Sequence, residues 1–397
     1  YVKYDKLESI YDGIESIRDK MNMPIFYNTY LRYKRDKEEL FKLGIKKNYK
    51  YLIKILLTEI DPSADNNYAI CSASETGHTY IVKLLLEDKR VNPSAKNNYA
   101  IRRASIDGHT LTVKLLLKDK RVDPSANDNY AIRKASEKRH TNTVKVLLED
   151  KRVNPSADNN YAIRYASERG HTEIVSLLLE DKRIDPSVDN NYAIREASKH
   201  GHTSTVELLL KDKRVDPSAD NNYAIRKASK HGYTSTVELL LKDKRVDPSA
   251  DNNYAIRKAS LRGYTKIVSL LLEDKRVDPS ADNNYAIRKA SKHGNTEIVS
   301  ILLKDKRVDP SVYKTNCALN WASLYGRTEV VSILIRDSRV DPSSNKNYAL
   351  RCACRNRNEG MVRILLKDPR VKKLHNKTLD ILIEKHTTGI LEILLQN

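Results

Sequence analysis

The sequence predicts an all-α solenoid of stacked helix–turn–helix repeats with short loops between the repeats. A proline recurs every 31 residues from Pro62 to Pro310, and a tyrosine recurs with the same step from Tyr68 to Tyr285. A fixed period of this length is typical of solenoids, in which each repeat packs only on its neighbours. The segment DPSADNNYAIRKAS stands unchanged three times, at 216–229, 247–260 and 278–291.

Each repeat begins with a turn that leads into a first helix, helix A. In the repeat at 61–91, residues 61–63 read Asp-Pro-Ser, and proline restricts φ and removes a backbone donor. Residues 65–67 read Asp-Asn-Asn, and we expect their side-chain oxygens to cap helix A. Helix A itself is predicted over 68–75, where Tyr, Ala and Ile supply the packing face.

A second helix, helix B, is predicted to follow after a glycine. Gly77 suits the left-handed conformation that ends a helix. Helix B is expected to start near Thr79, with the threonine hydroxyl as its cap and the apolar run IVKLLL buried. Because a residue before proline disfavours helix, Pro369 predicts that the last helix B stops by about Asp368. The other copies are predicted to stop at the aligned place.

The repeat signatures also predict the domain organisation. Residues 61–371 hold ten copies, and 27–60 look like a degenerate first copy. Residues 372–397 contain two short helical patterns without the signatures and are predicted to form a C-terminal capping repeat. Residues 1–26 are predicted to form an N-terminal helix or cap, because terminal repeats must present a polar outer face. The alternative is that 1–22 form a separate docking helix.

Charge and hydropathy limit the classes of function. Lys and Arg exceed Asp and Glu by 20 (72 minus 52), which favours an acidic partner and leaves nucleic acid as an alternative. The excess is spread over the repeats, so it also fits a solvated solenoid surface without a partner. No apolar run approaches the roughly 20 residues that a membrane span needs, and the first residues lack an apolar signal core. We therefore expect an intracellular protein, cytoplasmic or nuclear, that does not contact membranes.

The reactive residues do not indicate catalysis. Cys71, Cys317, Cys352 and Cys354 are few and unevenly spaced, which argues against a disulfide framework and suits a reducing compartment. No second cysteine pair accompanies Cys352 and Cys354 to complete a zinc site. The sequence contains no phosphate-binding glycine loop, nucleophile elbow or metal-spaced His/Glu cluster. We expect no enzyme activity, no cofactor and no metal.

Together, helix A and helix B resemble the ankyrin repeat. The family's helix A reads roughly TPLHLAA where this chain has YAIRKAS, and the family's G-H-x-E-V-V-K-L-L-L is close to GHTEIVSLLL at 170–179. The resemblance covers about residues 27–397. It implies a non-catalytic scaffold that binds proteins on a concave face formed by helix A and the inter-repeat loops. The particular version found here, NNYAIR…GHT…RVDPS, resembles ankyrin arrays of large DNA viruses of protists and of some single-celled eukaryotes.

The chain departs from the family in three ways. Its period is 31 residues instead of 33. The TPLH tetrapeptide is absent, and so is the glycine after helix B, where Lys89 and Lys151 stand. These departures predict short or irregular loops in place of the family's hairpin fingers.

Positions that vary between repeats are the candidates for partner binding. Repeats five to eight carry basic pairs in the last turn of helix A, and the last repeats add bulky side chains. The candidate residues are Lys199, His200, Lys230, His231, Arg262, Lys292, His293, Trp321, Leu324 and Tyr325. Together with the Arg-Lys pairs one turn earlier (226–227, 257–258 and 288–289), they would form a basic stripe that steers an acidic partner. For the arginines, the alternative is a ladder paired to loop carboxylates such as Asp220, Asp251 and Asp282.

Two other residue types stand out. Histidine recurs at the histidine position of the G-H-T motif in five repeats, one of which has Arg139 in place of the glycine. The family resemblance implies structural hydrogen bonds for it, and Tyr or Asn replaces it in later copies. Trp321 is the only tryptophan and lies in a repeat with one inserted residue near Tyr313. It is interpreted either as an interface anchor or as a local packing adjustment.

Three functions remain open from the sequence. The leading hypothesis is a protein-binding scaffold with an acidic partner, which would be a host protein if the viral resemblance holds. The compartment would then be the host cytoplasm or the virion. The second hypothesis is a structural solenoid that associates with itself or with a larger particle, because near-identical repeats give a regular surface. The third is nucleic-acid binding through the basic stripe, which few aromatic side chains support.

Overall fold

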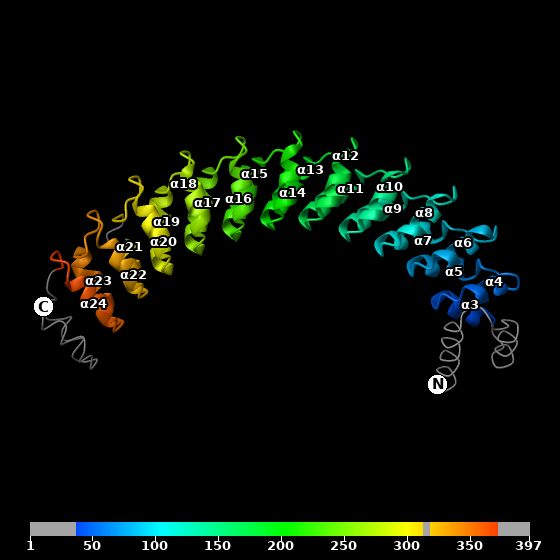
Figure 1. Cartoon of the computed structure of the whole chain (residues 1–397), viewed down its shortest axis with the longest axis horizontal. Helices are drawn as coiled ribbons and strands as arrows, with labels where there is room; N and C mark the ends of the chain where they lie inside the picture. The colour runs from blue at the N-terminus through cyan, green and yellow to red at the C-terminus, as the bar shows by residue number, and fades with distance from the viewer. Residues whose placement is uncertain (1–36, 313–317, 372–397) are drawn as a thin grey trace, which may run out of the picture. The chain divides into compact units, whose positions relative to one another are not determined.

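The computed structural model describes residues 37–312 and 318–371, and these residues form 22 helices and no strand. The predicted all-α fold of stacked helix pairs is therefore confirmed for them, with helix A and helix B alternating along the chain (Figure 1). The expected caps at 1–26 and 372–397 lie outside the described residues. The predicted domain boundaries therefore stay predictions.

The helices group into two compact units, which are described separately. The first contains residues up to 166 and 173–185, and the second contains 167–172 and residues from 186 onward. The first unit holds α3 (Lys37–Lys46), α4 (Lys50–Leu56), α5 (Ala64–Glu75), α6 (Thr79–Glu87), α7 (Ala95–Ile106), α8 (Thr110–Leu117), α9 (Ala126–Glu137), α10 (Thr141–Leu148), α12 (Thr172–Glu180) and most of α11 (Ala157–Glu168).

The second unit continues the alternation of helix A (odd labels) and helix B (even labels). It holds α13 (Val188–Lys199), α14 (Thr203–Lys211), α15 (Ala219–His231), α16 (Thr234–Leu241), α17 (Ala250–Arg262), α18 (Thr265–Glu273), α19 (Ala281–His293), α20 (Thr296–Leu303), α21 (Ala318–Leu324), α22 (Thr328–Leu334), α23 (Ser344–Arg355) and α24 (Glu359–Leu366).

A left-handed turn of three residues precedes the regular part of helix A. At the start of α17, Asp251, Asn252 and Asn253 have φ angles of 56°, 53° and 57°. Asn and Asp tolerate this conformation better than other residues with a Cβ atom, which explains the Asp-Asn-Asn signature. The expected helix capping by this triplet is wrong. The Asn253 Oδ1 atom instead accepts a hydrogen bond, 2.7 Å long, from the backbone N–H of Asp278 in the next repeat.

The arginine of the YAIR motif holds this turn in place. Arg257 donates from Nε to the carbonyl of Asn252 (2.8 Å) and from Nη2 to the carbonyl of Asp251 (3.2 Å). The left-handed φ angles of these residues interrupt the regular helix, and the guanidinium gives both carbonyls a hydrogen-bond partner. This repeated arrangement of Asp, Asn and Arg thus stands in place of an ordinary helix cap.

Helix A and helix B both contribute apolar side chains to the buried core. In α17 and α18, Ala255, Ile256, Ile267, Val268 and Leu271 are fully buried. In the series α15–α17–α19, each helix A packs on its own helix B and on the helix A of the neighbouring repeats. Alanine on helix A permits this close approach, and each fully buried Val, Ile or Leu side chain contributes roughly 1.5–3 kcal/mol through the hydrophobic effect.

Glycine and histidine form one contact between repeats. Gly77 has a φ of 74°, which confirms the predicted left-handed helix end. A Cβ atom on Gly108 would lie 2.3 Å from Nδ1 of His140, so only glycine leaves room for this ring. The His140 Nε2 atom lies 2.7 Å from the carbonyl oxygen of Ile106, and this confirms the structural role expected for histidine in the G-H-T motif.

The threonine of the same motif does not cap helix B. No side-chain cap is present at the start of α6, and the Thr79 hydroxyl lies 2.8 Å from the Thr112 hydroxyl of the next repeat. The predicted cap is therefore wrong, and the threonine bonds between repeats. Helix B ends as predicted, since α24 ends at Leu366, before Asp368, and α6 ends at Glu87, before the aligned Asp88.

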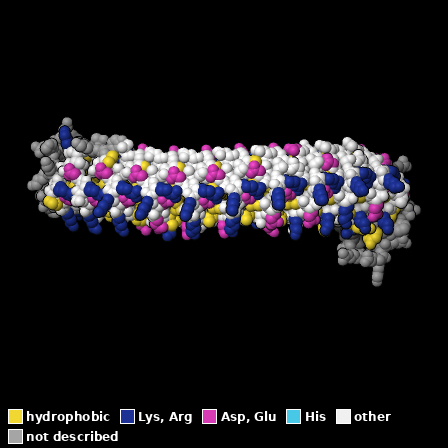
Figure 2. All heavy atoms as spheres, turned by 90° about the horizontal axis from the view of Figure 1, so that it is seen from above, with side chains coloured by type: hydrophobic (Ala, Val, Ile, Leu, Met, Phe, Trp, Pro, Cys, Tyr) yellow, Lys and Arg dark blue, Asp and Glu magenta, His cyan; other side chains and the backbone are white. Residues whose placement is uncertain are grey.

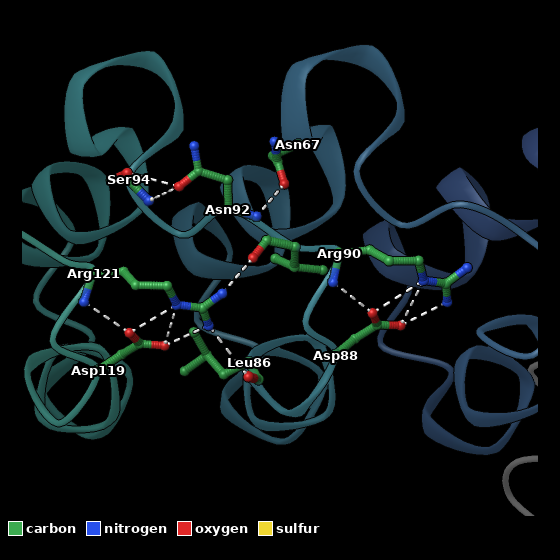
Figure 3. Close-up of polar contacts among 9 residues, drawn as sticks. Asn67, Leu86, Asp88, Arg90, Asn92, Ser94, Asp119 and Arg121 are labelled. Carbon is green, nitrogen blue, oxygen red and sulfur yellow. Dashed lines mark hydrogen bonds and ion pairs between the residues drawn. The ribbon is translucent and has the colours of Figure 1, made fainter.

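In most of the described repeats, the short segment after helix B contains an Asp–Arg pair (Figure 3). Asp119 pairs with Arg121 at 2.7 Å, and Arg121 also donates to the carbonyl oxygen of Val91 in the preceding repeat (2.8 Å). The hydrogen bond from Arg121 lowers the pKa of the Asp119 carboxyl below its usual value. Within each unit, side chains of Lys and Arg lie next to those of Asp and Glu in rows that recur with the repeat (Figure 2).

Candidate interaction surface

The candidate residues lie at the ends of five helices A in the second unit. Lys199 and His200 are at the end of α13, Lys230 and His231 at the end of α15, and Arg262 at the end of α17. Lys292 and His293 are at the end of α19, Leu324 ends α21, and Tyr325 follows it. The last candidate, Trp321, lies one turn earlier on α21. Because these helices A pack side by side in order, the candidates form one row across them.

The arginines one turn earlier do not belong to a free basic stripe. Arg226 pairs with Asp251 of the next repeat at 3.0 Å, and Arg257 pairs with Asp282 at 2.9 Å. Their side chains are only 13% exposed. The alternative prediction of an arginine ladder paired to loop carboxylates is confirmed at these positions, and the arginines act in the packing of repeats.

The side chains of Lys199 and His200 also lie beside a carboxylate of the same helix. The Glu196 carboxylate lies 2.7 Å from the Lys199 ammonium and 3.6 Å from Nε2 of His200. The hydrogen bond to Glu196 raises the pKa of Lys199. The basic charge of α13 is therefore partly neutralised, whereas the lysines of α15 and α19 lack such a carboxylate among the described residues.

The three lysines of the Arg-Lys pairs extend the row. Lys227, Lys258 and Lys289 lie one turn before the candidates and form no ion pair within the described part of the chain. Burial lowers the pKa of each ammonium, and neighbouring cations such as Lys230 and Lys292 lower it further. The sequence analysis included these lysines in the expected basic stripe, as the second members of the Arg-Lys pairs.

Aromatic rings alternate with these ammonium groups. The Lys227 ammonium lies 4.9 Å from the centre of the Tyr223 ring, and Lys258 lies 5.2 Å from the Tyr254 ring and 5.5 Å from the Tyr285 ring. Such cation–π contacts stabilise a cation without neutralising its charge. The surface therefore keeps its positive charge while the side chains are held in place.

The row ends at an aromatic pair. Trp321 is half-buried and stacks on Tyr325 with ring centres 6.1 Å apart. The Lys289 and Lys292 ammonium groups lie 4.5 and 4.6 Å from the tryptophan ring. Leu324 and Tyr325 are 41% and 45% exposed. Trp321 therefore takes part in local packing and also belongs to an exposed aromatic and apolar surface.

The same lysines affect the pKa of the histidines in the row. His231 and His293 lie on the exposed surface. Partial burial is the main cause that lowers their pKa, and the positive charges of the adjacent Lys230 and Lys292 lower it further. Both imidazoles are therefore held more strongly in the neutral form than a free histidine. They add hydrogen-bonding capacity to the row and little charge at neutral pH.

A separate apolar surface lies on helix B in the first unit, and the sequence analysis did not single it out. Tyr80 on α6 and Leu111 on α8 are 43% and 70% exposed. Lys83 and Lys114 border them in one shallow hollow. Both positions come directly before the apolar run of helix B, where other repeats carry polar residues such as Glu173 and Ser204. Comparison of the repeats could therefore have indicated that these two side chains are exposed.

The described residues show no other chemical centre. Among them, no group of His, Cys, Asp and Glu side chains could hold a metal ion. Cys71, Cys352 and Cys354 are free and buried, and burial raises the pKa of the Cys354 thiol to about 12. No helix in the described ranges is long and apolar enough to cross a membrane.

The comparison with protein families agrees with the helical repeats. A model of ankyrin repeats (3 copies) matches seven overlapping segments, at 42–128, 101–190, 130–223, 191–283, 222–314, 256–345 and 285–378. A search of curated proteins finds no significant match, so the resemblance to viral arrays stays a prediction. Because the matched segments cover most of the sequence, the chain belongs to the ankyrin repeat family.

Proposed function

We propose that this protein is a non-catalytic scaffold that binds an acidic protein partner through the ends of helices α15, α17, α19 and α21. The observation that carries the proposal is a row of lysines without carboxylate partners among the described residues, next to the exposed Leu324 and Tyr325. A cationic surface beside aromatic groups favours association with acidic segments and increases their rate of encounter. Ankyrin repeats are generally protein-interaction modules, which supports the same assignment.

Affinity capture from the source cells tests this proposal. Wild type is compared with a variant that carries Lys230→Glu, Arg262→Glu and Lys292→Glu, and bound proteins are identified by mass spectrometry. The matched control carries Lys118→Glu, Lys266→Glu and Lys304→Glu. These three positions lie on helix B or at its end, where other repeats already have glutamate (for example Glu87, Glu173 and Glu273).

The proposal expects a partner that the control retains and the first variant loses. An unchanged set of bound proteins would refute the basic row as the binding surface. Nucleic acid in the wild-type sample that disappears from the first variant would favour the nucleic-acid hypothesis. Recovery of further copies of this chain would favour the structural assembly.

A further inference from the structure

Glutamates within this chain show how the helix A surface holds a carboxylate. The Glu137 carboxylate accepts hydrogen bonds from the Lys134 ammonium and the Tyr161 hydroxyl, both at 2.7 Å through Oε2. Lys134 is one turn earlier on α9, and Tyr161 is on the neighbouring helix A. A lysine and a tyrosine of adjacent repeats thus share one carboxylate.

The same arrangement occurs at an equivalent position two repeats earlier. The Glu75 carboxylate accepts from Nη2 of Arg103 at 2.6 Å and from the Tyr99 hydroxyl at 3.1 Å. In this case the cation comes from the following repeat. The two examples show that the cation can come either from the helix that carries the glutamate or from the helix that carries the tyrosine.

In the second unit, the two repeats that hold α15 and α17 have no acidic residue at the position of this glutamate, but the tyrosine and the lysines that would bind a carboxylate are present. Lys230 and Leu261 stand where Glu137 stands in α9. The tyrosines of the following repeats are Tyr254 and Tyr285, and the flanking cations are Lys227, Lys258 and Lys289. The donors of the site are retained and only the acceptor is missing.

The retained groups are not paired elsewhere in the described structure. Among the residues described, the Tyr254 and Tyr285 hydroxyls have no hydrogen-bond partner and the three lysines have no ion pair. Burial and mutual repulsion lower the pKa of the lysines, whereas the pKa of Lys134 beside Glu137 is raised. A carboxylate in this place would remove the repulsion and satisfy the hydroxyls.

We infer that the second unit contains two carboxylate-binding sites, one formed by Lys227, Tyr254 and Lys258 and the other by Lys258, Tyr285 and Lys289. They receive two acidic side chains of one partner segment. This inference rests on the proposed function and specifies the chemistry of the partner. Their residues stand at the same repeat positions as those that hold Glu137 and Glu75. The Lys258 ammonium lies 5.5 Å from the centre of the Tyr285 ring, similar to the 4.9 Å between Lys134 and the Tyr161 ring.

The spacing of the sites limits the shape of the partner. Packed helices lie roughly 8–10 Å apart, so the two carboxylates are about one such distance apart. In a polyproline II segment, every third side chain lies on one face and successive ones are about 9 Å apart. An acidic residue at every third position of such a segment therefore fits both sites.

Binding of synthetic peptides to the full chain tests the sites. The probe is a fluorescent peptide of repeated Glu-Pro-Pro, and the control peptide has the same composition with its glutamates placed next to one another. Binding is measured by fluorescence anisotropy at several salt concentrations. The first peptide is expected to bind at least tenfold more tightly than the second, because only it presents carboxylates at the spacing of the repeats.

Leu261→Glu is the decisive variant, because it removes no cation and restores the internal acceptor beside Lys258 and Tyr285. It is expected to weaken binding of the Glu-Pro-Pro peptide roughly tenfold and to raise the melting temperature. Lys304→Gln, with the same change in net charge outside the row, is the control and should do neither. Unchanged binding or a lower melting temperature for Leu261→Glu would overturn the inference.

A second pair of variants tests the hydroxyls. Tyr254→Phe and Tyr285→Phe retain the rings over the lysines and remove the hydrogen-bond donors. Each is expected to weaken peptide binding several-fold without lowering the melting temperature. If an oligonucleotide of equal charge binds as tightly as the peptide, and the Phe variants bind both equally well, the carboxylate sites are refuted. The capture experiment then still tests the scaffold function separately.

Discussion

The buried asparagine between repeats offers the sharpest test of how this array is held together. Asn253 is 8% exposed, has a left-handed φ of 57°, and accepts a 2.7 Å hydrogen bond from the N–H of Asp278. Asn253→Ala leaves that N–H without its partner, at a cost of about 1–3 kcal/mol. The substitution also places alanine in the left-handed conformation, which asparagine tolerates better, and this destabilises the folded state by about 1–2 kcal/mol more.

Three further variants separate these two contributions. Asn252 is exposed, has a φ of 53°, and makes no side-chain hydrogen bond in the described structure. Asn252→Ala therefore reports the conformational cost alone, about 1–2 kcal/mol. Asn253→Gly removes the acceptor but tolerates the left-handed turn, and Asn253→Asp retains both the acceptor and the tolerance. We expect Asn253→Ala to be the most destabilising of the four and Asn253→Asp the least.

Urea unfolding of the full chain, followed by circular dichroism, measures these differences. Because repeats interact only with their neighbours, loss of the bond weakens the interface between two repeats and can also broaden the transition. Equal destabilisation by Asn253→Ala and Asn252→Ala would refute the argument, since it would mean that the hydrogen bond to Asp278 contributes nothing to stability.

Two further predictions concern the loops and the helix ends. The ten Asp–Arg pairs within the described ranges, such as Asp119 with Arg121, hold the pKa of their carboxyls below the usual value. Their contribution to stability is therefore complete above about pH 4 and is lost as the pH falls through the lowered folded-state pKa. Thermal melts from pH 6 to pH 2 should show this loss, and a melting temperature independent of pH would contradict it. Arg139 takes the left-handed place of glycine with a φ of 68°. Arg139→Gly should raise the free energy of unfolding by about 1 kcal/mol in urea titrations, because glycine removes this strain; a destabilised variant would count against that reason.

Several features followed directly from the repeated residues. The helix pairs, the turn at each Asp-Pro-Ser, the left-handed glycine and the buried apolar run were predicted, because each depends on contacts within a few residues. Histidine in the G-H-T motif was correctly interpreted as structural. The pairing of Arg226 with Asp251 was predicted only as an alternative, since the sequence does not reveal which loop carboxylate lies beside which helix.

The sequence by itself determined that this chain is an array of ankyrin-type helix pairs with basic residues gathered in its later repeats. Only the tertiary structure decided what the polar signature residues do. Asn253 and Thr79 look like helix caps in one repeat, but both bond to the next one. Likewise, Arg226 and Lys227 are adjacent basic residues in the sequence, yet in the described structure Arg226 pairs with Asp251 of the next repeat whereas Lys227 has no ion pair. The physical reason is that hydrogen bonds and ion pairs join residues about 25 to 35 positions apart, which the stacking of repeats brings together.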